Sequence, residues 1–298
     1  MPSFADYSNI YLEFKEHELK VSTFDKYSKI VQQRLLNTFG DLEIDKIKPS
    51  DVKRWLYSID DVGSKSKRHY ISVLSGIFKE ALYDEAILRN PVDLVRLPKH
   101  NKLDIFPFTP DEVNSIFEYS ECSKYKSYVY ISFLTGMRTG EIYALKKKDI
   151  DLKNGMIHVN RSRSRFGEST PKTFGSIRYV PILDTLKPIL KDLLASEDKS
   201  EYLLVTRLGE PYRDGNSYTN YFWKQMLKKL NLKYRRPYTS RHTFATNMLY
   251  SNLVTPPELA QILGHSSIQM VYDVYVSFIN KKLVNFDRSI TPYLRKGI

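Results

Sequence analysis

Arg138 stands in a context that suits the close approach of a ligand. It occurs in LTGMRTGEIYAL between Gly136 and Gly140, where glycine lets the backbone turn tightly and come close to a ligand. Glu141 follows in the first turn of the predicted helix. A surface arginine in a helix–helix turn fits this short string equally well.

A second arginine, Arg241, lies in RRPYTSRHTFATNMLY at a helix start that is marked by Pro237 and the pair Thr239 and Ser240. A cation in the first turn opposes the helix dipole, whereas a phosphate bound there is favoured by both the dipole and the guanidinium group. The alternative is a solvated arginine whose unfavourable interaction with the helix dipole costs about a few tenths of a kcal/mol. The buried face of this helix is predicted to consist of Phe244, Ala245, Met248 and Leu249.

His265 is predicted to occupy a corner between two helices. In TPPELAQILGHSSIQMVYDVYVSFI, Gly264 ends the first helix and Ser266 or Ser267 begins the second. The capping pattern of the first helix consists of Thr255, Pro256 and Glu258. The inward stripe of the second consists of Ile268, Val271, Tyr272, Tyr275 and Ile279. Taken singly, a corner histidine and a buried tyrosine most often serve packing or a local hydrogen bond.

The order of these motifs is more specific than any one of them. LTGMRTGEI is followed by PKTFGSIRYVPI, RHTFAT and LGHSSI, and then by a tyrosine ten residues after His265. This ordered set resembles the tyrosine recombinases, the phage integrase group, over nearly the whole chain. The resemblance implies a site-specific DNA recombinase that cleaves and religates strands for integration, excision or resolution of DNA.

The resemblance also implies a role for each matching residue. Arg138 and Arg241 would hold the phosphate and stabilise the charge of its transition state, and Glu141 would support Arg138. Lys172 on a hairpin, or His265, would supply the proton that the leaving 5′ oxygen needs. This chemistry requires no cofactor and no metal. The sequence has no phosphate-binding glycine loop followed by GK[ST], and no compact set of carboxylates for a two-metal nuclease.

Tyr275 is the nucleophile that the resemblance implies. A 3′-phosphotyrosine would store the energy of the phosphodiester, so that strands rejoin without ATP. Many family members place the nucleophile nine residues after the histidine, where this chain has Val274, and others place it ten residues after, at Tyr275. Tyr272 stands three residues before Tyr275 on the same predicted face. We expect Tyr275 to attack the phosphate.

Tyr238 departs from the common family pattern, in which a histidine precedes the second arginine by three residues. A phenol titrates near pH 10, so it can donate a hydrogen bond to phosphate but adds no positive charge and is a poor base at neutral pH. We interpret Tyr238 as a substitution within the catalytic set.

Helices are expected to position most of these residues. Residues 3–90 form a small helical domain, in which Ser22 or Thr23 caps a helix that ends at Gly40 and Ser50 caps the next. The last helix of this domain stops before Asn90. Its apolar stripe consists of Tyr70, Val73, Leu74, Ile77, Phe78, Ala81 and Leu82.

The predicted fold is mainly α with a small β-sheet. It comprises a four-helix, SAM-like core-binding domain at 1–97, a linker at 98–108, and a mixed α/β catalytic domain with a C-terminal tail at 109–298. In the second domain, Thr109 caps a helix and another helix ends near Thr135. Residues 156–183 read as two strands around a polar turn, and helices return after Leu183.

Charge and composition favour a polyanionic partner. The net charge is +12, of which residues 1–100, with 16 Lys+Arg and 15 Asp+Glu, contribute +1 and residues 101–298 contribute +11. The single cysteine, Cys122, excludes an internal disulfide and a multi-cysteine zinc site. Without a long apolar run or a signal-peptide pattern, we expect a soluble, cytoplasmic protein with no membrane partner.

The resemblance implies a C-shaped clamp on duplex DNA that carries a specific recombination site. It also implies a homotetramer on two DNA sites, in which the apolar tail beyond Phe278 docks on a neighbouring protomer, and it leaves room for an accessory DNA-bending protein. Two other readings are a non-catalytic, DNA-binding recombinase relative and a type IB topoisomerase. The apolar tail and the core-binding domain argue against the topoisomerase.

Overall fold

The computed structural model describes residues 1–97, 106–169, 177–265 and 267–275. Its contacts divide the chain into two compact units, Met1–Leu103 and Asp104–Ile298, so the division falls within the predicted linker 98–108. None of the helices in the described ranges combines the length and the apolar character that a bilayer-spanning segment needs.

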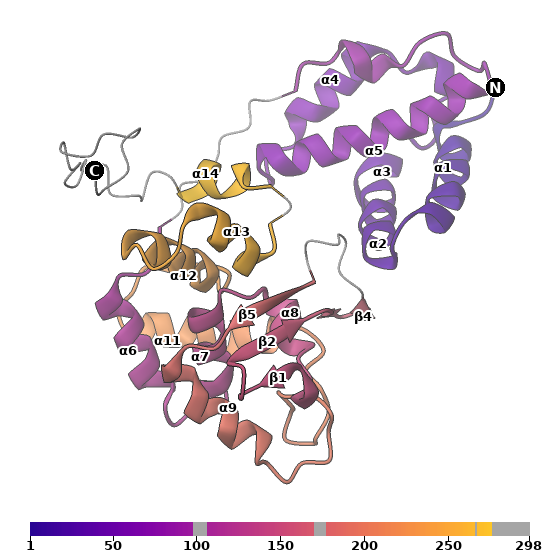
Figure 1. The fold of residues 1–298 in the computed structure, drawn as a ribbon. Helices are drawn as coiled ribbons and strands as arrows, with labels where there is room; N and C mark the ends of the chain where they lie inside the picture. The colour runs from indigo at the N-terminus through magenta and orange to yellow at the C-terminus, as the bar shows by residue number, and fades with distance from the viewer. Residues whose placement is uncertain (98–105, 170–176, 266, 276–298) are drawn as a thin grey trace, which may run out of the picture. The chain divides into compact units, whose positions relative to one another are not determined.

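The first unit is built from four helical segments in its described residues (Figure 1). The second of them is continuous, because α2 passes through a π-helical turn at Val31–Leu35 into α3. Short 3₁₀ turns lie at Ile44–Lys46 and Pro91–Leu94. The helices are α1 Phe4–Glu18, α2 Val21–Ile30, α3 Leu36–Phe39, α4 Pro49–Ser58 and α5 Ser64–Tyr83. The predicted four-helix arrangement is confirmed.

Two predicted caps of the first unit are wrong. α2 begins one residue before Ser22, so Ser22 and Thr23 lie inside its first turn and do not cap it. α4 begins at Pro49, so Ser50 also lies inside the helix. Proline is favoured at the first helical position because its fixed φ suits a helix and the N–H that it lacks would have no helical partner there.

The core of the first unit is aromatic where its helices meet. The ring centroid of Phe4 lies 5.6 Å from that of Phe39 and 5.7 Å from that of Phe78, and Trp55 packs edge-on against Phe39. The predicted stripe of α5 is buried at its centre, at Val73, Leu74, Ile77, Phe78 and Ala81. Burial of these side chains is the main stabilising term for a helical domain of this size.

The second unit combines helices with short strands (Figure 1). Its helices are α6 Pro110–Ser120, α7 Lys126–Thr135, α8 Thr139–Tyr143, α9 Lys187–Leu194, α10 Asn216–Tyr218, α11 Lys224–Lys229, α12 Thr239–Tyr250, α13 Pro256–Leu263 and α14 Gln269–Tyr275. Its strands are β1 Ile150–Asp151, β2 Met156–Val159, β3 Ser162–Ser164, β4 Gly167–Ser169 and β5 Arg178–Pro181. The predicted caps at Thr109 and Thr255 are confirmed, each as a capping box with the glutamate three residues later.

The strands form two separate antiparallel groups. β1, β2 and β5 make a three-stranded sheet in which Ile157 pairs with Val180, and both of these side chains are buried. β3 and β4 pair with each other as a hairpin, with Ser164 opposite Gly167. The prediction of two strands in this region is therefore too simple. Gly167 has a φ of +94°, and this left-handed conformation allows an additional tight turn that the sequence analysis did not recognise.

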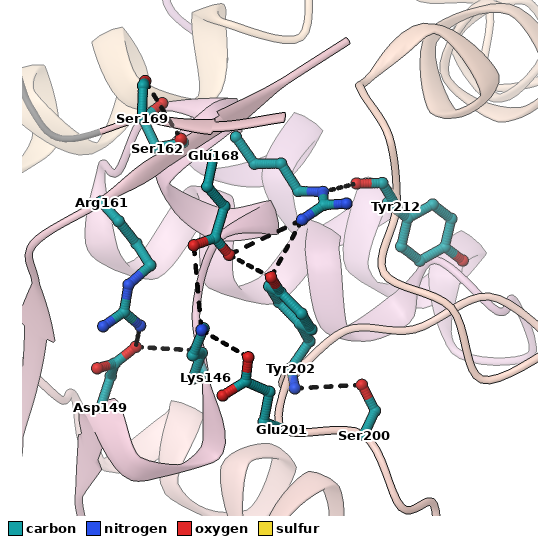
Figure 2. Close-up of polar contacts among 11 residues, drawn as sticks. Lys146, Asp149, Arg161, Ser162, Glu168, Ser169, Ser200, Glu201, Tyr202 and Tyr212 are labelled. Atoms are coloured by element: carbon teal, nitrogen blue, oxygen red, sulfur yellow. Dashed lines mark hydrogen bonds and ion pairs between the residues drawn. The ribbon is translucent and has the colours of Figure 1, made fainter. Parts of the chain in front are cut away.

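A polar cluster attaches the β3–β4 hairpin to the body of the second unit (Figure 2). Glu168 of β4 accepts a hydrogen bond from the Tyr202 hydroxyl and lies 4.0 Å from Lys146 Nζ, which also pairs with Glu201 at 2.6 Å. Arg163 of β3 donates to the Tyr202 hydroxyl at 3.1 Å. Partly exposed ion pairs contribute little singly, but a network of them restricts the hairpin.

Candidate active site

The last turn of α13 is where three arginines meet. α13 packs against α12, α14 and β5, so the end of this helix faces side chains from several segments. Three successive main-chain carbonyls there accept hydrogen bonds from arginine side chains. Arg178 Nε donates to the carbonyl of Ile262 at 2.6 Å, and Arg241 Nη2 donates to that of Leu263 at 2.8 Å. Arg138 Nη2 donates to the carbonyl of Gly264 at 3.4 Å. The final carbonyls of a helix have no helical partner and carry a partial negative charge, so they are suited to bind cations.

Arg241 is buried between the C-terminal ends of two helices. Its side chain is 1% exposed, and its Nη1 donates a 2.9 Å hydrogen bond to the carbonyl of Gly136, the C-cap of α7. Burial lowers the pKa of Arg241 to about 10. Its Nε is buried and has no hydrogen-bond partner among the described residues. The unfavourable place of this cation in the first turn of α12 is thus offset by two neighbouring helix ends. Among the described residues, no carboxylate binds the guanidinium group.

Two glycines supply carbonyls at this site because each adopts a left-handed conformation. Gly136 has a φ of +63° and Gly264 a φ of +66°. A Cβ on Gly136 would lie 2.5 Å from a ring carbon of Phe244, and a Cβ on Gly264 would lie 3.0 Å from the Arg178 side chain. Gly140 lies against the backbone of β3, because a Cβ added to it would be 2.8 Å from the carbonyl oxygen of Arg163. Its close contact is therefore with another segment of the protein and not with a ligand.

Glu141 joins two of the arginines and is itself 5% exposed. Its Oε1 lies 2.7 Å from Arg138 Nη1, and its Oε2 lies 2.8 Å from Arg178 Nη2. Burial alone would raise the pKa of the Glu141 carboxyl, but the two arginines together hold it below its usual value. The prediction assigned Glu141 to Arg138 alone. In the structure it also neutralises Arg178.

Arg178 is a site residue that the sequence analysis missed. It is 8% exposed and lies on the same face of β5 as the buried Val180. An arginine at an inward position of a short strand signals a buried partner, because a buried cation needs a counter-charge or hydrogen-bond acceptors. That signal was present in the motif PKTFGSIRYVPI.

The positive charges of all three arginines act on the imidazole of His265. Its main-chain N–H donates to the carbonyl of Ala260 at 3.0 Å, in the turn that follows α13. Burial lowers the pKa of the imidazole to about 4, and the positive charges of Arg241, Arg138 and Arg178 add to this effect. Its Nδ1 is buried without a partner in the described part of the chain. The imidazole is therefore neutral at pH 7.

Tyr275 is buried on the inner face of α14, where its side chain is 1% exposed. Its hydroxyl lies 2.8 Å from Nδ1 of His242 on α12. Burial raises the pKa of the Tyr275 phenol, although the nearby Arg241 acts in the opposite direction. His242 was not recognised in the sequence, even though it directly follows Arg241 in RHTFAT.

The predicted inward stripe of α14 is only partly correct. Val271 and Tyr275 are buried, whereas Ile268 is 40% exposed and Tyr272 is 38% exposed. The described helix is seven residues long, and positions four apart share its one buried face. Ile279 and Lys172 lie outside the described residues, as does Ser266. Ser267 is the residue whose hydroxyl accepts a 3.1 Å hydrogen bond from the N–H of Gln269 at the start of α14.

Tyr238 lies directly before α12, and its side chain is 42% exposed. Its ring packs edge-on against His242, with the ring centroids 5.1 Å apart. The tyrosine that replaces the usual histidine is thus a neighbour of the histidine that contacts Tyr275.

The arrangement is suited to bind an anion and to move a proton. Arginine groups meet beside a neutral histidine, and a buried phenol lies near one of them, Arg241. Such a group of cations stabilises the added negative charge of a five-coordinate phosphoryl transition state. In the described ranges, no group of three or more His, Cys, Asp or Glu side chains is arranged to hold a metal ion.

Comparisons with known proteins identify the family of the chain. Residues 107–280 match the model of the phage integrase family, and residues 3–59 match the model of the N-terminal SAM-like domain of phage integrases. The putative prophage phiRv2 integrase of Mycobacterium tuberculosis is 31% identical, in an alignment that covers 89% of this chain and 72% of that protein. The ICEBs1 integrase of Bacillus subtilis is 28% identical, with 92% of this chain and 78% of that protein covered.

The fold is also similar to that of solved integrases. The Tn1549 transposon integrase in complex with a circular intermediate DNA gives a TM-score of 0.76 at 24% identity, covering 90% of this chain and 94% of that one. A lambda integrase dimer bound to a core site gives a TM-score of 0.75 at 20% identity, covering 96% of this chain and 80% of that one. The order of the sequence motifs, the arginine cluster and the matched family models lead to one conclusion: the chain belongs to the phage integrase family of tyrosine recombinases, which carry out site-specific recombination of DNA.

Proposed function

We propose that this chain is an active recombinase that cleaves and rejoins DNA through a 3′-phosphotyrosine on Tyr275, without ATP or a metal ion. One observation carries the proposal. Arg138 and Arg241 meet at the end of α13 beside His265, and Tyr275 lies on the helix that follows. A phosphodiester held by these two arginines would lie at the end of α13, which packs against α14, the helix that carries Tyr275.

Arg138 and Arg241 are the residues that we assign to the phosphate. Arg241 suits this role because its charge is held by carbonyls and its Nε is unpaired within the described residues. Arg138 is about one third exposed, so it can reach a ligand while Glu141 holds one end of its guanidinium group. Arg178 suits a structural role, because its charge is neutralised by buried Glu141.

We assign the protonation of the leaving 5′ oxygen to Lys172. This assignment rests on the place of Lys172 in the motif PKTFGSIR, three residues after β4 ends. His265 is neutral and its Nδ1 has no partner in the described part of the protein, so it can hydrogen-bond a phosphate oxygen or share the proton transfer.

The proposed partner is duplex DNA with a specific recombination site. A lambda integrase tetramer bound to a Holliday junction has a similar fold, with a TM-score of 0.73 at 20% identity. By analogy, we propose a homotetramer on two DNA sites, in which residues 1–97 act as the core-binding domain and 109–298 as the catalytic domain. The excess of +11 in residues 101–298 predicts that DNA binding weakens steeply as salt rises.

The proposal is tested by trapping the covalent intermediate. The full chain is incubated with a nicked suicide substrate that carries the recombination site of the host element, and adducts are resolved on a denaturing gel. We expect an adduct whose nucleotide-bearing peptide contains Tyr275 by mass spectrometry. Tyr275→Phe should bind DNA but form no adduct, while Tyr272→Phe should still form it. Phosphate on Tyr272, or DNA binding without any adduct in the unaltered protein, would overturn the assignment.

A further inference from the structure

We propose that His242 is a further catalytic residue, which accepts the proton of the Tyr275 hydroxyl when that oxygen attacks DNA. This inference rests on the proposed function, because it concerns the nucleophile of the same reaction. His242 would supply the base that Tyr238 cannot supply, since Tyr238 stands where the family commonly has a histidine.

The contact between the two side chains has the geometry of a hydrogen bond to the reacting atom. His242 Nδ1 lies 2.8 Å from the Tyr275 hydroxyl oxygen, and the two ring centroids are 5.7 Å apart. His242 is on α12, one residue after Arg241, and Tyr275 is at the end of α14. A base within this distance can take up a proton without a bridging water.

The surroundings keep His242 in the form that accepts a proton. Burial lowers the pKa of the imidazole to about 4, and the adjacent positive charge of Arg241 also lowers it. At neutral pH the ring is therefore uncharged, and one of its nitrogens has a free lone pair. The direction of the hydrogen bond to Tyr275 depends on the imidazole tautomer, and the proposed step uses the tautomer in which Nδ1 is the acceptor and the phenol is the donor.

Other groups that face the Tyr275 hydroxyl are less suited to receive its proton. The charged and titratable groups that act on it most strongly in the described chain are Arg241 and Tyr238. A guanidinium is always protonated, and a phenol is a poor base at neutral pH. Arg241 has the complementary effect of favouring the negative charge that develops on the Tyr275 oxygen.

The proton balance of the step is complete with residues already assigned. As the Tyr275 oxygen forms its bond to phosphorus, its O–H bond breaks and the proton moves to Nδ1 of His242. The bond from phosphorus to the 5′ oxygen breaks, and that oxygen takes a proton from Lys172. In religation both transfers run backwards, so the phenol recovers its proton from His242. The bound DNA phosphate adds a negative charge nearby, which favours the imidazolium that forms during the step.

His242→Asn separates base catalysis from positioning, because its side-chain oxygen can still accept a hydrogen bond but cannot take up a proton at neutral pH. Single-turnover cleavage of a nicked suicide substrate is measured with the full chain from pH 5.5 to 9.5. We expect the unaltered protein to be nearly independent of pH above pH 6. His242→Asn should cleave on the order of 10²-fold more slowly at pH 7, with a rate that rises with pH because solvent must remove the proton.

A matched control is His158→Asn, since His158 lies on β2 and stacks on Tyr179 of the same sheet. It should cleave at the unaltered rate. His242→Gln and His242→Ala repeat the test if His242→Asn unfolds, and DNA affinity is measured for each variant. Equal rates for His242→Asn and the unaltered protein would overturn the inference, as would a slower rate with an unchanged pH profile. Absence of cleavage in the unaltered protein would instead refute the proposed function.

Discussion

Arg241 Nη2 donates a 2.8 Å hydrogen bond to the main-chain carbonyl of Leu263, the last residue of α13. A buried arginine is usually paired with a carboxylate, which cancels its charge. Here carbonyls at two helix ends hold the guanidinium in place among the described residues, and we propose that its formal charge binds a phosphate. Arg178, in contrast, is paired with Glu141, so neighbouring arginines have different electrostatic roles.

Arg241→Lys should abolish most of the strand cleavage. An ammonium group cannot span two carbonyls and a phosphate in the way that a planar guanidinium can. We expect the single-turnover cleavage rate to fall on the order of 10²–10³-fold, which is the usual loss when one group that stabilises transition-state charge is removed. DNA affinity, measured by gel shift, should fall much less. Arg235→Lys, which alters an arginine paired with Glu112 elsewhere in the unit, is the control for general destabilisation.

Glu141→Ala should destabilise the second unit, because it leaves two arginines without their shared counter-charge. Removing one member of a buried ion pair costs about 3–5 kcal/mol. The free energy of unfolding, obtained from urea titrations, should fall by about that amount. Glu141→Gln, which keeps the shape and one acceptor oxygen, should lose less. Equal stability of both variants and the unaltered protein would contradict a structural role for Glu141.

Gly136→Ala tests the left-handed turn that gives its carbonyl to Arg241. A Cβ there meets the Phe244 ring at 2.5 Å, in addition to the strain of a φ of +63°. Gly155→Ala is the matched control, because Gly155 has a φ of +66° but nothing within 4 Å of its Cβ position. Left-handed strain alone costs roughly 1–2 kcal/mol. Gly136→Ala should lower the midpoint of thermal unfolding more than Gly155→Ala and should also slow cleavage.

Stability should fall as the pH decreases from about 6.5 to about 4. His242 and His265 have pKa values lowered to about 4 in the folded chain, mainly by burial, whereas an unfolded histidine titrates near 6.5. The unfolded state therefore binds more protons within this window, so the free energy of unfolding falls as the pH falls through it. Urea titrations at several pH values measure this slope. His265→Gln should reduce it, whereas an unchanged slope would contradict the burial of the imidazole.

Lys172→Ala should slow cleavage of an ordinary phosphodiester by removing the general acid. A substrate with sulfur in place of the leaving 5′ oxygen needs little protonation, so it should recover much of the lost rate. The two substrates are compared in single-turnover reactions of the same variant. If the sulfur substrate is equally impaired, another residue protonates the leaving group. Lys233→Ala, a lysine that packs over Phe106, is the control for loss of one positive charge.

Local sequence determined the helices, their glycine ends and the order of the reactive residues. Caps such as Thr255 and the left-handed Gly264 depend on hydrogen bonds between residues close in the chain, so their patterns are readable without a fold. The predictions at Ser22 and Ser50 failed because α2 and α4 begin after Lys20 and Lys48, which make no side-chain capping hydrogen bond, so a serine near a helix start does not fix the position of its cap. The β3–β4 hairpin was missed because its strands are three residues each, too short for an alternating pattern to be recognised.

Tertiary structure alone decided the partners of the reactive side chains. Arg241 and Gly136 are 105 residues apart, and Arg178 and Glu141 are 37 apart. The side-chain period of a helix or strand indicates which face is buried, but it cannot specify which distant atom meets that face. The same limit applied to His242, whose type and position were visible beside Arg241 in the sequence. Its role depends on the packing of α14, which brings the Tyr275 hydroxyl to within 2.8 Å of one imidazole nitrogen.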